Sequence, residues 1–209
     1  NTVLQAIADA DFIQENNVRL VAEPWTAGGN YGALIGAYPN STSGVGGWGE
    51  WNARFRDWWR DFVNRDEWRL NTPISNEWNA SADGGFVMTG SSAYYGHNGR
   101  KPWHSQNFVS IHDGMTMYDL FTYETKVNGC GPLNPVCCDD PASSWCDRES
   151  GDNDNRSRDW GGHPSGEADK RAMMRTMFAA MLVSHGTPLL LGGDEWMRTQ
   201  LGNNNAYST

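Results

Sequence analysis

The clearest hydrophobic pattern along the chain lies between residues 55 and 63. Large apolar side chains recur there at the three- and four-residue spacing of one helix face, and charged residues occupy the positions between them. The pattern predicts an amphipathic helix whose tryptophan-rich stripe packs into a core. The apolar positions are Phe55, Trp58, Trp59, Phe62 and Val63.

A second strong helix is predicted by the methionine-rich stripe between residues 174 and 182. Ser165 is a candidate N-cap, and Glu167 and Asp169 place negative charge in the first turn, where the helix dipole favours it. Gly186 is expected to end the helix.

Weaker patterns predict further helices. One covers residues 2–14, with Thr2 as a candidate N-cap, and another begins at Met117. Between the helical segments, residues 24–50 form a glycine-rich stretch and residues 64–106 an irregular polar one, which both indicate loops. The apolar face expected in the first helix consists of Val3, Ile7 and Ala10.

Three short apolar runs predict buried strands, at residues 18–22, 108–111 and 189–191. They alternate with the predicted helices, which is the order of elements in a parallel α/β fold. The pattern leaves open whether the sheet closes into a barrel or stays open as a doubly wound sheet. No glycine-rich phosphate-binding motif follows any of these runs, which disfavours a nucleotide-binding fold.

The charge balance narrows the range of partners. The 209 residues contain 25 acidic and 16 basic side chains, a net charge of −9. Nucleic acids and anionic membranes attract clustered lysine and arginine, so neither is expected as a partner. No apolar run reaches the roughly 20 residues that a membrane-spanning helix needs. The 11 tryptophans weakly favour a carbohydrate ligand, because flat aromatic faces suit stacking on sugar rings.

All four cysteines lie in one segment rich in proline and aspartate. An even, local cluster of cysteines predicts one or two disulfides, and with them an oxidising, secreted or extracellular location; a cytoplasmic location is the alternative. A zinc site is disfavoured because the spacing lacks the two C-x2-C pairs of common zinc sites. The cysteines are Cys130, Cys137, Cys138 and Cys146.

Two carboxylates that follow predicted strands are candidates for catalysis. Glu23 directly follows the run that ends at Ala22, and Asp113 follows the run that ends at Ile111. A side chain at a strand's carboxyl end sits on a rigid stem and faces a pocket built from loops. Such carboxyl groups suit the cleavage of a glycosidic bond, which needs an acid for the leaving oxygen and negative charge beside the developing positive charge.

A further acidic segment, residues 152–155, looks superficially like a calcium-binding loop. It fails the EF-hand pattern, because Arg156 stands at the fifth loop position and Ser157 where glycine is needed. A solvated loop without metal is therefore predicted.

Five segments match the motifs of one known family in the family's order. The segment 22–25 is similar to the strand end that carries the general acid/base, and 48–52 to the sixth-strand region. His112-Asp113-Gly114 is similar to a late His-Asp pair, 186–195 to the eighth-strand pattern G-x-P-x-x-x-x-G-x-E, and 198–207 to its extension. Together they resemble the isoamylase-type glycogen and starch debranching enzymes of the α-amylase superfamily (glycoside hydrolase family 13).

The resemblance implies a fold and an activity. Residues 1–209 would form the C-terminal part of a catalytic (β/α)8 TIM barrel, from about its fourth helix to its eighth strand, with a Cys-rich insertion at about residues 128–164. The family's nucleophile motif belongs before residue 1, so the chain is expected to be part of a longer enzyme and inactive alone. The implied reaction is hydrolysis of α-1,6 branch linkages in glycogen, amylopectin or related α-glucans, with retention of configuration.

The resemblance also implies roles for particular side chains. Glu23 would be the general acid/base, Asp113 the stabiliser of the transition state, and His112 a hydrogen-bond donor to the same sugar. Asp194, Glu195 and Arg198 are expected to organise the rim of the site, and a structural ion network is the alternative for two acids beside an arginine. The remaining candidates for substrate binding are Trp25, Tyr31, Trp103 and Arg198.

Two alternative functions stay open. Another hydrolase of the same superfamily, pullulanase-like or α-1,4-acting, would share these motifs. A non-catalytic glucan-binding subunit would keep the barrel but lose its catalytic acids, and the presence of Glu23, His112 and Asp113 argues against it. A branched α-glucan is the expected partner. No cofactor is expected in this segment, although calcium could occupy another part of a full-length enzyme.

Overall fold

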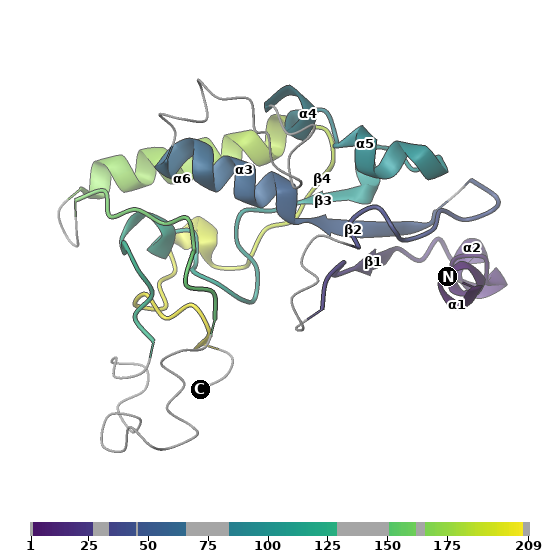
Figure 1. Ribbon diagram of the computed structural model, residues 1–209, viewed down its shortest axis with the longest axis horizontal. Helices are drawn as coiled ribbons and strands as arrows, with labels where there is room; N and C mark the ends of the chain where they lie inside the picture. The colour runs from purple at the N-terminus through teal and green to yellow at the C-terminus, as the bar shows by residue number, and fades with distance from the viewer. Residues whose placement is uncertain are drawn as a thin grey trace, which may run out of the picture. The chain divides into compact units, whose positions relative to one another are not determined.

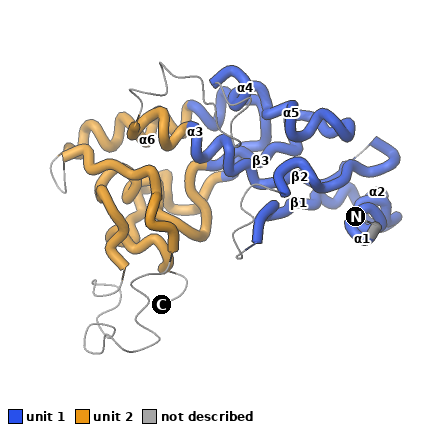
Figure 2. Tube along the Cα trace, in the orientation of Figure 1, with its two compact units in different colours: residues 1–58, 71–108, 180–189 blue, residues 59–70, 109–179, 190–209 orange. Residues whose placement is uncertain are grey.

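The computed structural model describes residues 2–26, 34–44, 46–65, 84–128, 151–161 and 166–206. The chain folds as two compact units, which Figure 2 colours separately. Unit 1 comprises residues 1–58, 71–108 and 180–189, and unit 2 comprises residues 59–70, 109–179 and 190–209.

Unit 1 is built on a parallel sheet of four short strands (Figure 1). They are β1 (Leu20–Ala22), β2 (Trp48–Asn52), β3 (Ser105–Asn107) and β4 (Thr187–Pro188). Neighbouring strands are parallel and lie in chain order, so the described sheet has no point at which the strand order reverses. Doubly wound sheets contain such a switch point. The predicted parallel α/β fold is confirmed.

The two strong helix predictions are confirmed by α3 (Ala53–Asn64) and α6 (Glu167–Val183), which each have residues in both units. No helix within the described ranges is long and apolar enough to cross a membrane. The other helices are short: α1 (Thr2–Ala8), α2 (Asp11–Glu15), α4 (Gly84–Met88) and α5 (Ser92–Tyr95), with single turns of 3-10 helix at η1 (Gly96–Asn98), η2 (Pro102–His104), η3 (Asp119–Phe121) and η5 (Asp194–Trp196).

Several weaker predictions were wrong. The single helix expected over residues 2–14 is divided into α1 and α2. Of its expected apolar face, Val3 and Ile7 are exposed, at 70% and 38%, and Ala10 lies between the two helices. Residues 64–106 contain α4 and α5, whose shortness hides their periodicity, and the helix expected from Met117 is the single turn η3.

Two strands lie earlier in the chain than their apolar runs. β3 ends at Asn107, just before the run 108–111, and β4 ends at Pro188, just before the run 189–191. Residues 108–111 are nevertheless buried. The difference arises because strands are defined by main-chain pairing, whereas the apolar runs report side-chain burial, which continues beyond the paired residues.

Asn52 explains why α3 begins directly after β2. Its Oδ1 accepts a hydrogen bond from the backbone N–H of Phe55 (3.0 Å), which is the interaction an N-cap side chain makes. Its Nδ2 donates to the hydroxyls of Ser91 (2.9 Å) and Ser105 (2.8 Å). One buried side chain therefore starts the helix and ties it to β3.

Gly186 allows β4 to approach β3. Its φ is +141°, and an added Cβ would lie 2.4 Å from Nδ2 of Asn107. Asn107 also donates from Nδ2 to the carbonyl of His185 (3.1 Å) and accepts the N–H of Leu189 at its own carbonyl (2.8 Å). The first glycine of the 186–195 motif therefore has a structural cause.

A fully buried ion pair joins Glu50 of β2 to Arg100, with Arg100 Nη1 at 2.5 Å from Glu50 Oε1. Glu50 also accepts the backbone N–H groups of Gly36 (2.7 Å) and Tyr38 (3.2 Å). The guanidinium of Arg100 lies 4.9 Å from the centre of the Tyr95 ring. Burial, followed by the charge of Glu50, raises the pKa of Tyr95. The ion pair thus ties two loops of unit 1 to the middle of the sheet.

We expect Glu50→Gln to lower the free energy of unfolding by roughly 3–5 kcal/mol, because it leaves Arg100 charged and unpaired in the interior. Urea denaturation of the protein that carries this chain, followed by tryptophan fluorescence, measures the change. Glu15→Gln, at an exposed position of α2, is the matched control and should change it by no more than about 0.5 kcal/mol. Equally small effects of both substitutions would show that the buried pair adds no stability.

Candidate active site

Glu23 lies at the carboxyl end of β1, in unit 1. It directly follows the last residue of the strand, its side chain is exposed, and the next residue, Pro24, is buried. Because it is exposed and directly follows a strand, Glu23 is an accessible carboxyl group on a rigid stem, as a group that must reach a ligand requires. Burial raises the pKa of Tyr38, and the negative charges of Glu50 and Glu23 add to this effect.

Three aromatic rings support the segment that carries Glu23. The ring centre of Trp25 lies 6.0 Å from that of Trp51 and 6.5 Å from that of Phe108, and Trp51 and Phe108 are 6.1 Å apart. Trp51 belongs to β2 and Phe108 directly follows β3, so the cluster joins the carboxyl ends of three neighbouring strands. Aromatic pairs of this kind contribute about 0.5–1.5 kcal/mol beyond their burial. Within this cluster, Trp25 remains partly exposed.

His112 and Asp113 lie on a loop of unit 2. His112 is exposed, whereas Asp113 is partly buried. Oδ1 of Asp113 is buried and has no hydrogen-bond partner among the described residues. A buried carboxylate oxygen without a partner is costly, and a ligand hydroxyl would satisfy it. Asp113 therefore has the surroundings of a ligand-facing group.

Asp194, the first residue of η5, contacts this loop on both sides of Asp113. It is 1% exposed, and its Oδ2 accepts a hydrogen bond from the hydroxyl of Ser110. Its Oδ1 accepts the backbone N–H of Met117 (3.2 Å). Burial raises the pKa of Asp194, and these two hydrogen bonds and nearby arginines act in the opposite direction. Asp194 thus anchors the two ends of the loop.

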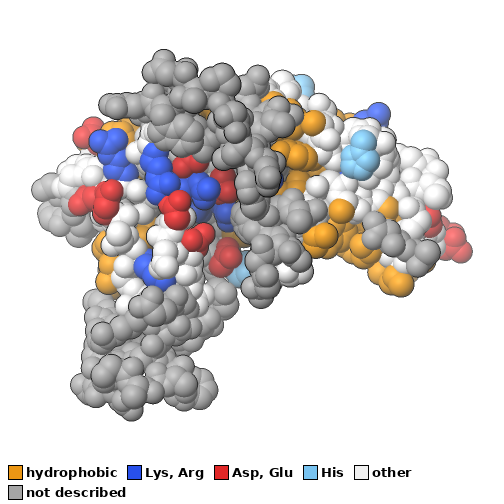
Figure 3. All heavy atoms as spheres, in the orientation of Figure 1, with side chains coloured by type: hydrophobic (Ala, Val, Ile, Leu, Met, Phe, Trp, Pro, Cys, Tyr) orange, Lys and Arg blue, Asp and Glu red, His pale blue; other side chains and the backbone are white. Residues whose placement is uncertain are grey.

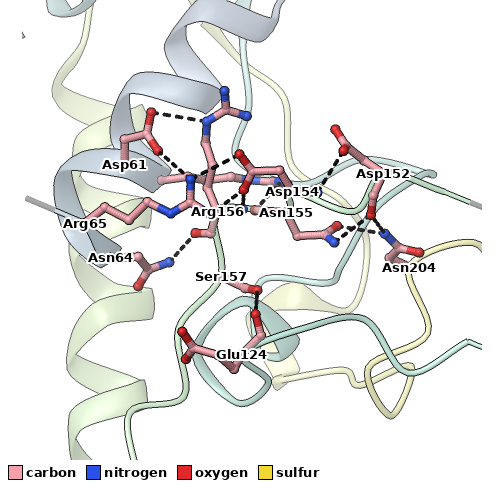
Figure 4. A network of polar contacts seen from close by, with 11 residues as sticks. Asp61, Asn64, Arg65, Glu124, Asp152, Asp154, Asn155, Arg156, Ser157 and Asn204 are labelled. Carbon is pink, nitrogen blue, oxygen red and sulfur yellow. Dashed lines mark hydrogen bonds and ion pairs between the residues drawn. The ribbon is translucent and has the colours of Figure 1, made fainter.

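Asn204 holds the middle of the same loop, because its carbonyl accepts the N–H of Gly114 (2.8 Å). The side chains and backbone of Asn204 and Asn128 exchange two hydrogen bonds, of 2.8 and 2.9 Å. Nδ2 of Asn204 donates to the carbonyl of Asp152 (2.7 Å) and to Oδ1 of Asn155 (2.9 Å), as Figure 4 shows. Asn204 is therefore itself fixed by segments distant in sequence.

The acidic segment 152–155 is bound to α3, and the prediction of a solvated loop holds only for its exposed first part. Asp154 accepts from Nη1 of Arg65 (3.1 Å), and the next basic residue, Arg156, donates from Nε to Asp61 of α3 (3.1 Å; Figure 4). Asn155 is buried. In Figure 3, acidic and basic side chains mix on this face of unit 2 instead of forming areas of one charge. Among the described residues, no cluster of three or more histidine, cysteine, aspartate or glutamate side chains could hold a metal ion.

Arg198 follows η5 in unit 2. Its Nη1 donates to Oε1 of Gln200 (3.0 Å), and its buried Nε has no hydrogen-bond partner in the part of the chain that the structure describes. Asp119, whose pKa is raised by burial, fixes the following turn by accepting the hydroxyl of Thr199 (2.5 Å) and the N–H of Gln200 (2.7 Å). Arg198 is thus held on an anchored turn.

Trp103 lies at the opposite ends of the strands from Glu23. It belongs to η2, before the amino end of β3, and is 54% exposed. Because all strands are parallel, Glu23 lies at the carboxyl ends of the strands and Trp103 at their amino ends. Trp103 lines a pocket of about 520 Å³ with residues such as Leu20 and Thr187. Tyr31 and the four cysteines at positions 130, 137, 138 and 146 lie outside the described residues.

The predicted site residues are divided between the units: Glu23 and Trp25 belong to unit 1, and His112, Asp113 and Arg198 to unit 2. An accessible carboxyl group can exchange a proton with a substrate. A fixed, partly buried carboxylate suits the stabilisation of positive charge. These are two of the roles that glycosidic cleavage requires.

Four supporting residues were not predicted from sequence: Trp51, Phe108, Ser110 and Asn204. For Trp51 a local signal exists, because strand alternation places Gly49 and Trp51 on one face of β2. Ser110 and Asn204 act through partners far away in the chain, so no local pattern indicates their roles.

Comparisons with known proteins agree with the resemblance in the motifs. The chain is 38% identical over 193 residues to an isoamylase from Flavobacterium sp, and 36% identical over 198 residues to the chloroplastic isoamylase 1 of Oryza sativa subsp. japonica. A glycogen operon protein GlgX homolog from Mycobacterium bovis is 36% identical over 206 residues. These alignments cover 90%, 91% and 94% of this chain. No family model matches the chain.

A solved structure, the pullulanase from Bacillus acidopullulyticus, matches 99% of this chain with a TM-score of 0.53 and 20% sequence identity. The match covers 20% of the pullulanase chain. At this identity the likeness concerns the fold alone. By fold, the chain is a parallel α/β protein that resembles a segment of this pullulanase. By sequence, the chain is homologous to isoamylases along nine-tenths of its length, which confirms the family resemblance.

The chain spans about a fifth of the length of the isoamylases it matches, since the alignments cover 21% of each. The rice relative is named as chloroplastic, and none of the three names indicates secretion. The comparisons therefore give no support to the secreted or extracellular location expected from the cysteines.

Proposed function

We propose that this chain is part of a glycoside hydrolase that cleaves α-1,6 branch linkages of glycogen, amylopectin or related α-glucans. The observation that carries the proposal is the surroundings of Asp113, an anchored acid whose buried Oδ1 lacks a partner among the described residues. Glu23, taken by itself, is an exposed acid at a strand end. Homology to isoamylases over nine-tenths of the chain supports the same function.

In this proposal, residues 1–209 belong to the C-terminal part of a catalytic (β/α)8 barrel. The parallel order β1-β2-β3-β4 without a switch point supports a barrel over a doubly wound sheet. Glu23 and the His112–Asp113 loop follow the carboxyl ends of β1 and β3, and the active sites of such barrels are built at that end of the strands. The rest of the barrel, including the nucleophile, belongs to the longer protein.

The mechanism assigns each carboxyl group one task. Glu23 protonates the glycosidic oxygen as the branch leaves, and later takes a proton from the water that releases the second product. Asp113 stabilises the positive charge that develops on the sugar, and His112 donates a hydrogen bond to the same sugar. Trp25 and Arg198 contact neighbouring sugars. Trp103, at the amino ends of the strands, is left out of this site.

Reducing-end release from amylopectin, linear amylose and pullulan by the full-length protein tests the proposal. We expect release from amylopectin and none from amylose. Release from amylose would instead favour an α-1,4-acting hydrolase, and release from pullulan as well as amylopectin a pullulanase-like one. Binding of amylopectin without release from any of the three would favour a non-catalytic glucan-binding subunit.

The cysteine cluster at positions 130–146 supports a separate prediction, that at least one disulfide forms within it. Mass spectrometry of the non-reduced peptide should show a deficit of two hydrogens per bridge, which disappears when the same sample is reduced. Four free thiols in protein taken from its native compartment would overturn both the bridge and the oxidising location.

A further inference from the structure

We propose that Asp194 is a positioning residue that holds Asp113 in its catalytic orientation. The inference rests on the proposed function and extends it to a carboxylate that touches no substrate. It differs from the rim role expected from the sequence, because Asp194 is 1% exposed and its hydrogen bonds go to the loop that carries Asp113.

The geometry brackets Asp113 with a single carboxylate. Oδ2 of Asp194 accepts the hydroxyl of Ser110, before Asp113 in the chain, and Oδ1 accepts the N–H of Met117, after it (3.2 Å). Ser110 is 2% exposed and Met117 1% exposed, so both hydrogen bonds lie in the interior, where bonds to an ionised group are stronger than in water. The loop between these tethers cannot shift without breaking one of them.

Asp113 needs such support, because its buried Oδ1 makes no hydrogen bond to any described residue. Its orientation therefore depends on the backbone of the loop. Asp194 is itself fixed, since its N–H donates to the carbonyl of Leu191 (3.1 Å) and its carbonyl accepts the N–H of Met197 (3.0 Å). The segment after β4 thus transmits a fixed position to Asp113.

Two substitutions in the full-length protein separate the tethers from the charge. Asp194→Ala removes both tethers and should lower kcat on amylopectin by about 10- to 100-fold, because a displacement of about 1 Å has an effect of that size. KM should change by less than about threefold, since the contact that weakens, between Asp113 and the positive charge on the sugar, is made in the transition state. Asp194→Asn can keep both bonds, with its oxygen accepting from Met117 and its amide donating to Ser110, and should retain kcat within about threefold of the parent.

Asp61→Ala is the matched control. Asp61 is an equally buried aspartate of unit 2, at 2% exposure, and its partners Arg156 and Arg65 lie outside the loop. It should lower the melting temperature but leave kcat within about twofold of the parent. In an Asp113→Ala background, Asp194→Ala should cost less than about threefold more, because Asp194 acts through Asp113.

A parental kcat in Asp194→Ala, or an equal loss of kcat in Asp61→Ala, would overturn the positioning role. If Asp194→Ala fails to fold, Ser110→Ala removes one tether and should lower kcat by about 3- to 10-fold; a parental value there would also overturn it. Full turnover in Asp113→Ala would instead contradict the proposed function of Asp113. Loss in Asp113→Ala together with full turnover in Asp194→Ala contradicts the positioning role alone.

Discussion

Glu23→Gln in the full-length protein is expected to lower the turnover of amylopectin by about 10²- to 10⁴-fold or more, because an amide cannot protonate the glycosidic oxygen. Binding of amylopectin should be largely retained, since the glutamine has the size of the exposed side chain it replaces. Steady-state kinetics and a glucan co-sedimentation assay measure the two quantities separately.

A substrate with a good leaving group makes this prediction sharper. Departure of fluoride from an α-maltosyl fluoride needs little protonation, so Glu23→Gln should impair this step less than the cleavage of a branch. Glu15→Gln, at an exposed position of α2, should leave both activities unchanged. Unchanged turnover of amylopectin by Glu23→Gln would remove Glu23 from the mechanism, and equal losses on both substrates would point to a misfolded site.

The 209 residues expressed alone are expected to release no reducing ends from amylopectin, although they include Glu23, His112 and Asp113. A retaining mechanism needs a nucleophile about 5 Å from the acid, on the opposite face of the sugar. In our proposal this residue belongs to the protein that precedes residue 1. The isolated chain should therefore lose the whole activity, a larger effect than that of any single substitution.

The surface of the isolated chain points to the same result. Apolar side chains are exposed on α6 and after β4, with Leu182 at 65%, Val183 at 65% and Leu190 at 50% accessibility. Within the described sheet, β1 and β4 are edge strands. Open sheet edges and exposed apolar side chains of this kind favour aggregation. Supplying the remaining barrel, covalently or as a second fragment, should restore solubility and debranching. Release of reducing ends by the purified 209-residue chain alone would show that the nucleophile has been misplaced.

The sequence predicted the elements whose apolar positions repeat over several turns. α3 and α6 were found because burial along one face of a long helix produces a stripe. β2 was missed as a hydrophobic strand, since its Gly49, Glu50 and Asn52 are polar or small; resemblance to a known motif alone indicated it. Glu50 and Asn52 are nevertheless buried, because Arg100 and neighbouring hydroxyls satisfy them.

The positions of the proposed site residues were predicted to the extent that they depend on strand ends. Glu23 follows β1 as expected, because a chain leaving a strand at its carboxyl end needs no distant partner to place it there. Trp103 shows the limit of this reasoning, since an aromatic residue near a strand in sequence can lie at either end of the strand. The role of Asp194 depends on its contacts with Ser110 and Met117, more than 70 residues away, which no local pattern contains.

Proton NMR of amylopectin during digestion by the full-length protein tests the central claim most directly, because anomeric signals report both the linkage cleaved and the configuration of the first product. Our account predicts that the α-1,6 signal falls while the α-1,4 signal is unchanged, and that new reducing ends appear first as the α-anomer, as a retaining mechanism requires. A falling α-1,4 signal, or new ends that appear first as the β-anomer, would contradict it.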